Sequence, residues 1–293
     1  MTNARTLTEA LGGRWHGSYG LAFCPAHRNT RTPALSLSDG AGGRLLARCH
    51  AGCRFPAIAD ALRSRGLLDG GVCAAPDPAE LARRRAEEQA EAEKRGRQAQ
   101  ALWREAGPIS GTIAEAYLLG RGITCALPDT LRFHPSCWHK SARRFPALVA
   151  RVDGAEGFAV HRTYLAPDGP GKAEAEPAKA MLGAVKGGAV RLTDGPGTLV
   201  VAEGVETALS LACGLLRAPA TIWAALSTSG MRGLRLPARP QRLTIAHDGD
   251  VAGRYAAHIL AERAHALGWA VSFLPAPSGR DWNDVLRMKG GDA

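Results

Sequence analysis

The 293-residue sequence lacks several features that would place it in a particular class of protein. It has no apolar run of membrane-spanning length, and its first residues contain no apolar segment like that of a secretory signal peptide. Aromatic residues make up only 5%, which argues against an extensive base-stacking surface. The phosphate-binding pattern GxxxxGK[ST] is absent, so a fused motor domain of that kind is not expected.

Acidic residues are in the minority. The chain has 27 Asp and Glu against 37 Lys and Arg, a formal net charge of +10, which favours polyanionic partners such as nucleic acid or nucleotides. Hydrophobic residues make up 45%, enough for a packed core. The seven cysteines do not resemble a disulfide scaffold, and we therefore expect a reduced, cytoplasmic setting without a membrane partner.

Composition and periodicity divide the chain into four segments. Residues 1–70 hold a cysteine/histidine cluster among short strand-like runs, and residues 71–107 form a linker and a long charged helix that begins near Pro78. Residues 108–193 are a mixed α+β block with many basic residues. Residues 194–293 alternate apolar strands with helices, which predicts a parallel, Rossmann-like sheet covered on both faces. The expected fold class is therefore α/β.

The N-terminal cluster has the spacing of a structural zinc site. "FCPAH" supplies Cys24 and His27, and "RCHAGC" supplies Cys49 and Cys53 as a second close pair. Two such pairs can complete a tetrahedral shell around Zn²⁺. His50 could replace Cys49, because His50 and Cys53 have the tighter spacing. The other cysteines lack such partners and are expected to be buried or inert thiols; they are Cys73, Cys125, Cys137 and Cys213.

Pairs of carboxylates come just after apolar strands at three places in the alternating segment. They are Glu203 and Glu206 in "VVAEGVETALS", Asp248 and Asp250 in "TIAHDGDVAGR", and Asp281 and Asp284 in "PSGRDWNDVL". The carboxyl ends of parallel strands lie along one edge of a sheet, so these acids are expected to converge there. Converging carboxylates in a basic protein predict a site for a hard cation such as Mg²⁺ or Mn²⁺.

These motifs resemble a known family. "EGVETALS", "DGDVAGRYAA" and "GRDWND" are similar to the three acidic motifs of the Toprim domain of primases, topoisomerases and several nucleases. The N-terminal cluster resembles the zinc-binding domain that precedes Toprim in bacterial and phage primases. The stretch from His161 to Leu192 resembles the basic subdomain ahead of Toprim in plasmid- and phage-borne primase-like proteins.

The resemblance implies roles for individual residues. Glu203 would be the acid/base residue, Asp248 and Asp250 the metal ligands, and Asp281 the completing acid, while the roles of Glu206 and Asp284 stay open. Basic residues would hold the nucleotide triphosphate or the template backbone; they are Arg162, Lys172, Lys179, Lys186 and Arg254.

The function implied is that of a DNA primase, or a primase-like protein of a mobile element, which makes short RNA primers on single-stranded DNA. Nucleoside triphosphates and a separate replicative helicase would be its partners. Two alternatives stay open: a Toprim nuclease using the same metal site, and a non-catalytic zinc/Toprim recombination mediator. A topoisomerase is disfavoured because no separate DNA-cleaving domain with a catalytic tyrosine is visible.

Overall fold

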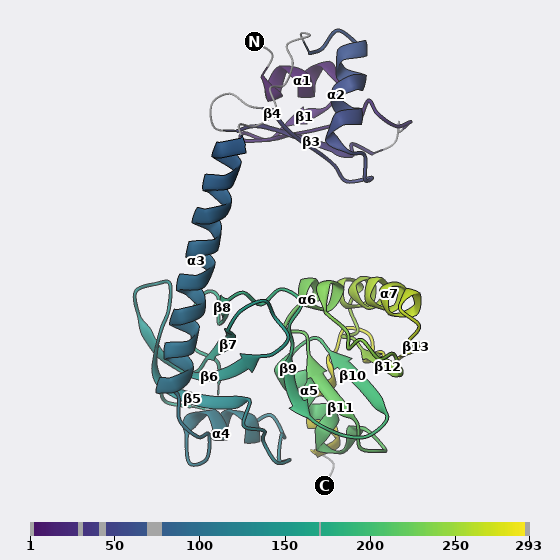
Figure 1. Cartoon of the computed structure of the whole chain (residues 1–293). Coiled ribbons are helices and arrows are strands. Elements are labelled where there is room, and N and C mark those ends of the chain that lie inside the picture. The colour runs from purple at the N-terminus through teal and green to yellow at the C-terminus, as the bar shows by residue number, and fades with distance from the viewer. Residues whose placement is uncertain (1–2, 29–31, 41–44, 69–77, 170, 291–293) are drawn as a thin grey trace. The chain divides into compact units, whose positions relative to one another are not determined.

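The computed structural model describes residues 3–28, 32–40, 45–68, 78–169 and 171–290 (Figure 1). It consists of two compact units, Met1–Leu81 and Ala82–Ala293. Cys73 and the linker predicted before Pro78 lie outside the described residues. Within those ranges, every helix is too short or too polar to cross a membrane.

The first unit is a small four-stranded antiparallel sheet with two helices. Its elements are α1 (Ala4–Ala10), β1 (Arg14–Trp15), β2 (Gly20–Ala22), β3 (Leu35–Asp39), β4 (Leu45–Cys49) and α2 (Phe55–Ser64), and the strand order is β1-β2-β3-β4. Leu35 and Leu37 of β3 alternate with more exposed residues and pack against Leu7 of α1 and Ile58 of α2. This core is small, so a bound metal would contribute much of the unit's stability.

The long helix predicted from Pro78 is present as α3 (Pro78–Glu105). Its run of charged residues is typical of an exposed spacer helix, but its last turns contain buried residues. Ala99 and Trp103 are buried at 0% and 7% exposure within the second unit. The Arg132 guanidinium lies over the Trp103 ring, 4.4 Å from its centroid, and Nη1 of Arg132 donates to the Trp103 carbonyl. The helix therefore ends as part of the second unit's core.

After α3, the second unit continues with α4 (Ile113–Leu119) and a four-stranded antiparallel sheet. Its strands, in spatial order, are β5 (Leu131–Trp138), β6 (Arg144–Val152), β7 (Ala159–Tyr164) and β8 (Lys179–Gly183). Apolar runs in the sequence predicted β6 and β7. Neither β5 nor β8 was predicted, since both carry polar or small residues at positions where a strand pattern needs apolar ones.

The C-terminal part is a five-stranded sheet in the order β13-β12-β10-β11-β9. All neighbours are parallel except β9, which is antiparallel to β11. The elements are β9 (Val190–Thr193), β10 (Thr198–Ala202), α5 (Val205–Ser210), the π-helical turn η2 (Leu211–Leu215), β11 (Thr221–Ala224), α6 (Thr228–Gly233), β12 (Arg242–Ala246), α7 (Val251–Ala266), β13 (Ala270–Phe273) and α8 (Trp282–Gly290). The predicted α/β class is confirmed.

Alternation along β10 explains how this sheet is covered on both faces. Val200 packs with Leu209 of α5, while Val201, on the other face, packs with Leu260 of α7. The α5 side also holds Leu148 of β6, so the antiparallel and parallel sheets share one core. The two sheets consequently belong to one unit, which fixes the position of residues on β8 relative to the carboxyl edge of the parallel sheet.

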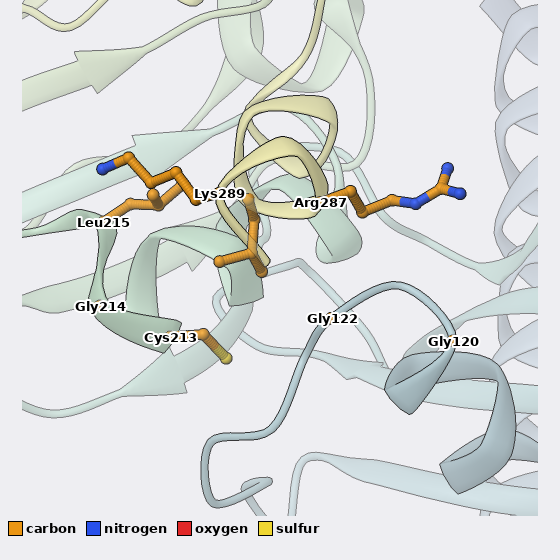
Figure 2. Close-up of a pocket in the computed structure, with 8 residues that line it drawn as sticks. Gly120, Gly122, Cys213, Gly214, Leu215, Arg287 and Lys289 are labelled. Carbon is orange, nitrogen blue, oxygen red and sulfur yellow. The ribbon is translucent and has the colours of Figure 1, made fainter. Parts of the chain in front are cut away.

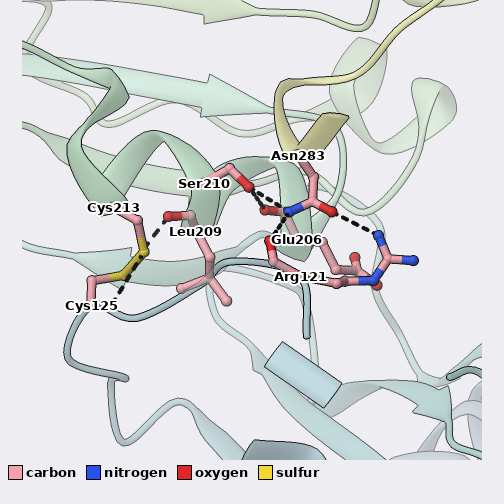
Figure 3. The surroundings of a disulfide bond; sticks show 7 residues. All are labelled: Arg121, Cys125, Glu206, Leu209, Ser210, Cys213 and Asn283. Carbon is pink, nitrogen blue, oxygen red and sulfur yellow. Dashed lines mark hydrogen bonds between the residues drawn. A yellow bond between two sulfur atoms is a disulfide. The ribbon is translucent and has the colours of Figure 1, made fainter. Parts of the chain in front are cut away.

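A disulfide joins Cys125, in the segment after α4, to Cys213 in η2 (Figure 3). The expectation that these two cysteines have no partner is wrong. Their 88-residue separation hides the pairing from any pattern of sequence spacing. Cys137 is a buried free thiol, as expected.

Asn283 joins three elements in the same region (Figure 3). Its side chain is fully buried; Nδ2 donates to the Arg121 carbonyl and to Ser210 Oγ, both at 2.9 Å, and Oδ1 accepts from Arg121 Nη1 at 2.8 Å. Ser210 Oγ in turn donates to the Glu206 carbonyl. The third acidic motif is therefore tied to α5 and to the end of α4 by a satisfied polar network.

Replacing Asn283 with Ala should destabilise the protein by about 2 kcal/mol, because buried groups of Ser210 and Arg121 lose their partner. Chemical denaturation measures the change. Lys289→Ala, at an exposed position of the same helix, is the matched control and should leave the unfolding free energy nearly unchanged. Equal stability of the Asn283→Ala protein and the wild type would contradict a structural role for this network.

Candidate active site and metal centres

Acidic side chains gather at the carboxyl edge of the parallel sheet because β10 and β12 are neighbours in register. Ala202 pairs with Ala246, so Glu203 leaves β10 at the level of His247, and Asp248 follows one residue later. Asp281 directly precedes α8. The carboxyl edge at which the sequence predicts the acids is thus formed by the ends of β10 and β12.

Gly249 brings the third motif to the second. A Cβ atom at this position would lie 1.9 Å from the Pro277 carbonyl oxygen, so only glycine permits the close approach. The Gly249 N–H donates to the Arg280 carbonyl at 2.8 Å, and the Gly279 N–H donates to the Gly249 carbonyl at 3.1 Å. This backbone pairing places Asp281 beside the aspartates on either side of Gly249.

Asp250 is the N-cap of α7. Its Oδ1 accepts from the Gly253 N–H at 2.6 Å, which satisfies one of the free donors at the helix start. The positive end of the helix dipole interacts favourably with a carboxylate at this position. Asp250 is therefore oriented by its own helix and exposed to solvent.

The charges of these carboxylates act on one another. Burial, followed by the charges of Glu203, Asp281 and Asp250, raises the pKa of Asp248 to about 7, against an opposing effect of Lys179. Burial and the Asp250 charge also raise the pKa of Glu203, while a backbone hydrogen bond from Thr228 and the Lys179 charge act to lower it. The four acids form one mutually repelling group, which we call the acidic group.

The acidic group fits a hard divalent cation. Oδ1 of Asp248 is buried and has no hydrogen-bond partner in the structure, and carboxylate oxygens are the ligands that Mg²⁺ and Mn²⁺ prefer. A cation at this position would relieve the repulsion and satisfy the orphaned oxygen. Magnesium commonly keeps several waters and needs only one or two protein carboxylates, which agrees with ligation by Asp248 and Asp250.

Two of the predicted basic residues face this group. Lys179, at the start of β8, carries a charge that opposes the rise in the pKa of both Glu203 and Asp248. Its Nζ lies 2.8 Å from Glu206 Oε2. Lys172 is half-buried; burial, followed by the neighbouring Lys179 charge, lowers its pKa, while Glu206 and Asp281 oppose this. Both lysines therefore belong to the electrostatic surroundings of the acids.

The other three basic residues lie differently. Arg162 is buried in β7, where its Nη1 and Nη2 donate to the carbonyls of Trp138 and Met181. Lys186 is exposed between β8 and β9. Arg254 is exposed on α7, and its Nη1 donates to the Gly249 carbonyl at 3.2 Å. Nucleotide or DNA binding by these three stays a prediction.

The first unit brings the predicted zinc ligands together. One ligand atom from each of Cys24, His27, Cys49 and Cys53 lies within 4.8 Å of the others, and in the described part of the chain no other set of three or more potential ligands has this spacing. Nδ1 of His27 lies 3.2 Å from Cys53 Sγ. His50 is exposed and outside this set. Three thiols and one imidazole at this spacing fit tetrahedral Zn²⁺.

Sequence reasoning missed the environment of Glu206. Its carboxylate is 3% exposed, and Tyr117 of α4 donates to Oε1 at 2.8 Å. His161 of β7 is also buried; burial and the Lys179 charge lower its pKa to about 4, so it is neutral. No local pattern in "AEAYLLG" marks Tyr117 as a partner of a residue 89 positions away.

A cavity of about 490 Å³ lies between the end of α4, η2 and α8 (Figure 2). None of the acidic group lines it. Arg287 and Lys289 extend from opposite sides of α8 in Figure 2, so their charges do not converge on one point. The cavity is separate from the acidic group, and its lining residues do not bring positive charges together as an anion-binding site would.

Without divalent cations, folding stability should fall between about pH 4 and pH 7. The pKa of Asp248 is about 7 in the folded protein against 3.8 for the unperturbed group, so its stabilising protonation is complete below about 4 and is lost as the pH rises through 7. Denaturation of magnesium-free protein across this range measures the slope. Asp248→Asn should flatten it, whereas an identical slope in both proteins would contradict the assignment.

Comparison with known proteins is consistent with this site. Residues 198–292 match the model of the Toprim domain, and residues 93–192 match a domain of unknown function (DUF7146). A search of curated proteins gives no match.

The solved structures that are similar to the chain include the following three. A DNA primase domain from Pseudomonas aeruginosa is 18% identical, with a TM-score of 0.41 over 67% of this chain and 75% of that one. The Aquifex aeolicus primase (zinc-binding and RNA polymerase domains) is 15% identical, with a TM-score of 0.40 over 100% and 81%. The RNA polymerase domain of Mycobacterium tuberculosis primase DnaG is 18% identical, with a TM-score of 0.37 over 69% and 79%.

Because these TM-scores are low, the assignment of the C-terminal part to the Toprim domain rests on the match to the Toprim model and on the position of the three acidic motifs. The matched residues contain β10 to α8, and all three acidic motifs meet at the carboxyl edge of their parallel strands. The C-terminal part of the chain is a Toprim domain.

Proposed function

We propose that this chain is a primase-like nucleotidyltransferase, which synthesises short RNA primers on single-stranded DNA from nucleoside triphosphates. The observation that carries the proposal is the convergence of Glu203, Asp248, Asp250 and Asp281 at one edge, opposite Lys179. Phosphoryl transfer requires carboxylates that bind a cation and positive side chains that contact the phosphates, and this edge offers both. The Toprim match supports the same class of chemistry.

Each residue would have a distinct task. Asp248 and Asp250 would hold Mg²⁺ or Mn²⁺, which neutralises charge on the triphosphate when bound. Glu203 has a raised pKa and would accept the proton of the attacking 3′-hydroxyl. Lys172 and Lys179 would contact phosphate oxygens as point charges.

The first unit would bind one structural zinc ion through Cys24, His27, Cys49 and Cys53 and would contact the template. The donor set supports this, because two short-range pairs meet at tetrahedral spacing. Burial raises the pKa of Cys24 to about 11, so zinc binding would have to displace the thiol proton.

Purified protein should therefore contain one zinc ion per chain, and its removal should destabilise chiefly residues 3–68. The small core of this unit cannot replace the stabilisation lost with the metal. Elemental analysis gives the metal content, and hydrogen exchange before and after chelation locates the effect. Absence of zinc from protein purified without chelator would contradict the site, as would equal loss of protection in the second unit.

Primer synthesis should depend on the acidic group. Asp248→Asn and Glu203→Gln should each lower the rate at least about 100-fold while leaving the fold intact, since one charge or one proton acceptor is lost without a change in shape. Incubation with single-stranded DNA, labelled ribonucleotides and Mg²⁺ measures product. Glu156→Gln, at an exposed surface ion pair, is the control and should retain full activity.

The same incubation separates the alternatives. Short RNA products support the proposal, and shortened DNA without RNA products would replace it with a nuclease. DNA binding without either product would favour a non-catalytic mediator. Full primer synthesis by Asp248→Asn would place the metal site elsewhere.

A further inference from the structure

Two glutamates of the first acidic motif occupy opposite environments. Glu203 is half-buried in the acidic group, whereas Glu206, one helical turn later in α5, is 3% exposed. Both oxygens of Glu206 are hydrogen-bonded: Tyr117 Oη donates to Oε1 and Lys179 Nζ to Oε2, each at 2.8 Å. The partners come from α4 and β8, outside the parallel sheet.

The surroundings of these two carboxylates shift their pKa values in opposite directions. Burial acts to raise the pKa of Glu206, but the Lys179 charge and hydrogen bond, together with the Lys172 charge, outweigh it and hold the pKa well below its usual range. Glu206 is thus ionised and forms an ion pair with Lys179. Glu203, in contrast, has a raised pKa. The environment separates a buried counter-ion from a proton-accepting group within one motif.

Lys179 is the cation that these carboxylates share. Its charge opposes the rise in the pKa of Glu203 and Asp248, and its Nζ donates to Glu206. An ammonium group has three donors, and the bond to Glu206 uses one of them. Its side chain is 35% exposed, so the remaining donors can reach a ligand at the acidic edge.

We propose that Glu206 is a positioning residue that fixes the Lys179 ammonium at the edge of the acidic group, where the lysine contacts a phosphate of the bound nucleoside triphosphate. Tyr117 holds the carboxylate from the opposite side. The inference rests on the proposed function for its ligand, a nucleoside triphosphate. It gives Glu206 a role separate from metal ligation, because both of its oxygens already accept hydrogen bonds.

Binding of ATP with Mg²⁺, measured by calorimetry, tests the proposal. Glu206→Gln keeps the shape of the side chain and removes the charge, and Lys179→Ala removes the ammonium. Each should weaken binding about tenfold, the scale of one charge-assisted hydrogen bond. If Glu206 acts through Lys179, the double variant should bind no more weakly than Lys179→Ala alone. In primer synthesis Glu206→Gln should raise KM for nucleotide more than it lowers kcat.

Wild-type affinity in Glu206→Gln would overturn the proposal, and so would additive losses in the double variant. Tyr117→Phe removes only the hydroxyl that holds Oε1, so it provides a second variant should Glu206→Gln fail to fold. It should weaken ATP binding about two- to threefold, and unchanged affinity would count against the proposal. Glu156→Gln is the control. Wild-type protein that binds ATP but makes no primer would refute the proposed function alone, whereas absence of ATP binding would refute both.

Discussion

Repulsion among four carboxylates at one sheet edge is the constraint on which the candidate site depends. Burial, followed by the neighbouring like charges, opposes ionisation of these carboxylates, and the raised pKa values of Glu203 and Asp248 express that cost. The Lys179 charge opposes this repulsion at both residues. A divalent cation would neutralise the repulsion that Lys179 leaves, and it could bind the buried oxygen of Asp248 that has no partner among the described residues.

The fold maintains this unfavourable arrangement with backbone contacts and core packing that do not involve the acids themselves. Register between β10 and β12 sets the first two motifs side by side, and the close approach at Gly249 adds the third. Asn283 then ties α8 to α5 and to the end of α4 through fully paired polar groups. Each acid is therefore positioned by stable structure, which lets the carboxylates remain crowded at modest cost to the fold.

Lys179 illustrates why the antiparallel sheet and the Toprim domain form one unit. The lysine begins β8, its counter-ion Glu206 lies in α5, and Tyr117 lies in α4. A buried carboxylate that lost either partner would be left with an uncompensated charge or lone pair. The apolar core shared by Leu148 and Val200 holds the two sheets together and keeps this polar contact in place.

Features that depend on local pattern could be predicted from the sequence, and features that depend on long-range packing could not. The apolar runs gave β10, β11, β12 and β13 in order, and the topology of parallel strands then placed Glu203 and Asp248 at one edge. The ligand pairs of the zinc site are likewise local in the chain. The Cys125–Cys213 disulfide and the Tyr117–Glu206 hydrogen bond join residues 88 and 89 positions apart, and no local spacing encodes such contacts.

Glu206 shows the limit of reading acidic motifs by residue type. In "EGVETALS" both glutamates are candidates for the same chemistry, and one helical turn separates them. Glu203 precedes the helix and meets other carboxylates, whereas Glu206 lies within the fully buried α5 and meets a phenol and an ammonium group. The first turn of α5 carries Glu206 to Tyr117 and Lys179, and these residues then fix its ionisation. What a carboxylate of this motif can do is therefore decided by whether it precedes α5 or lies within it, and by the elements packed around it.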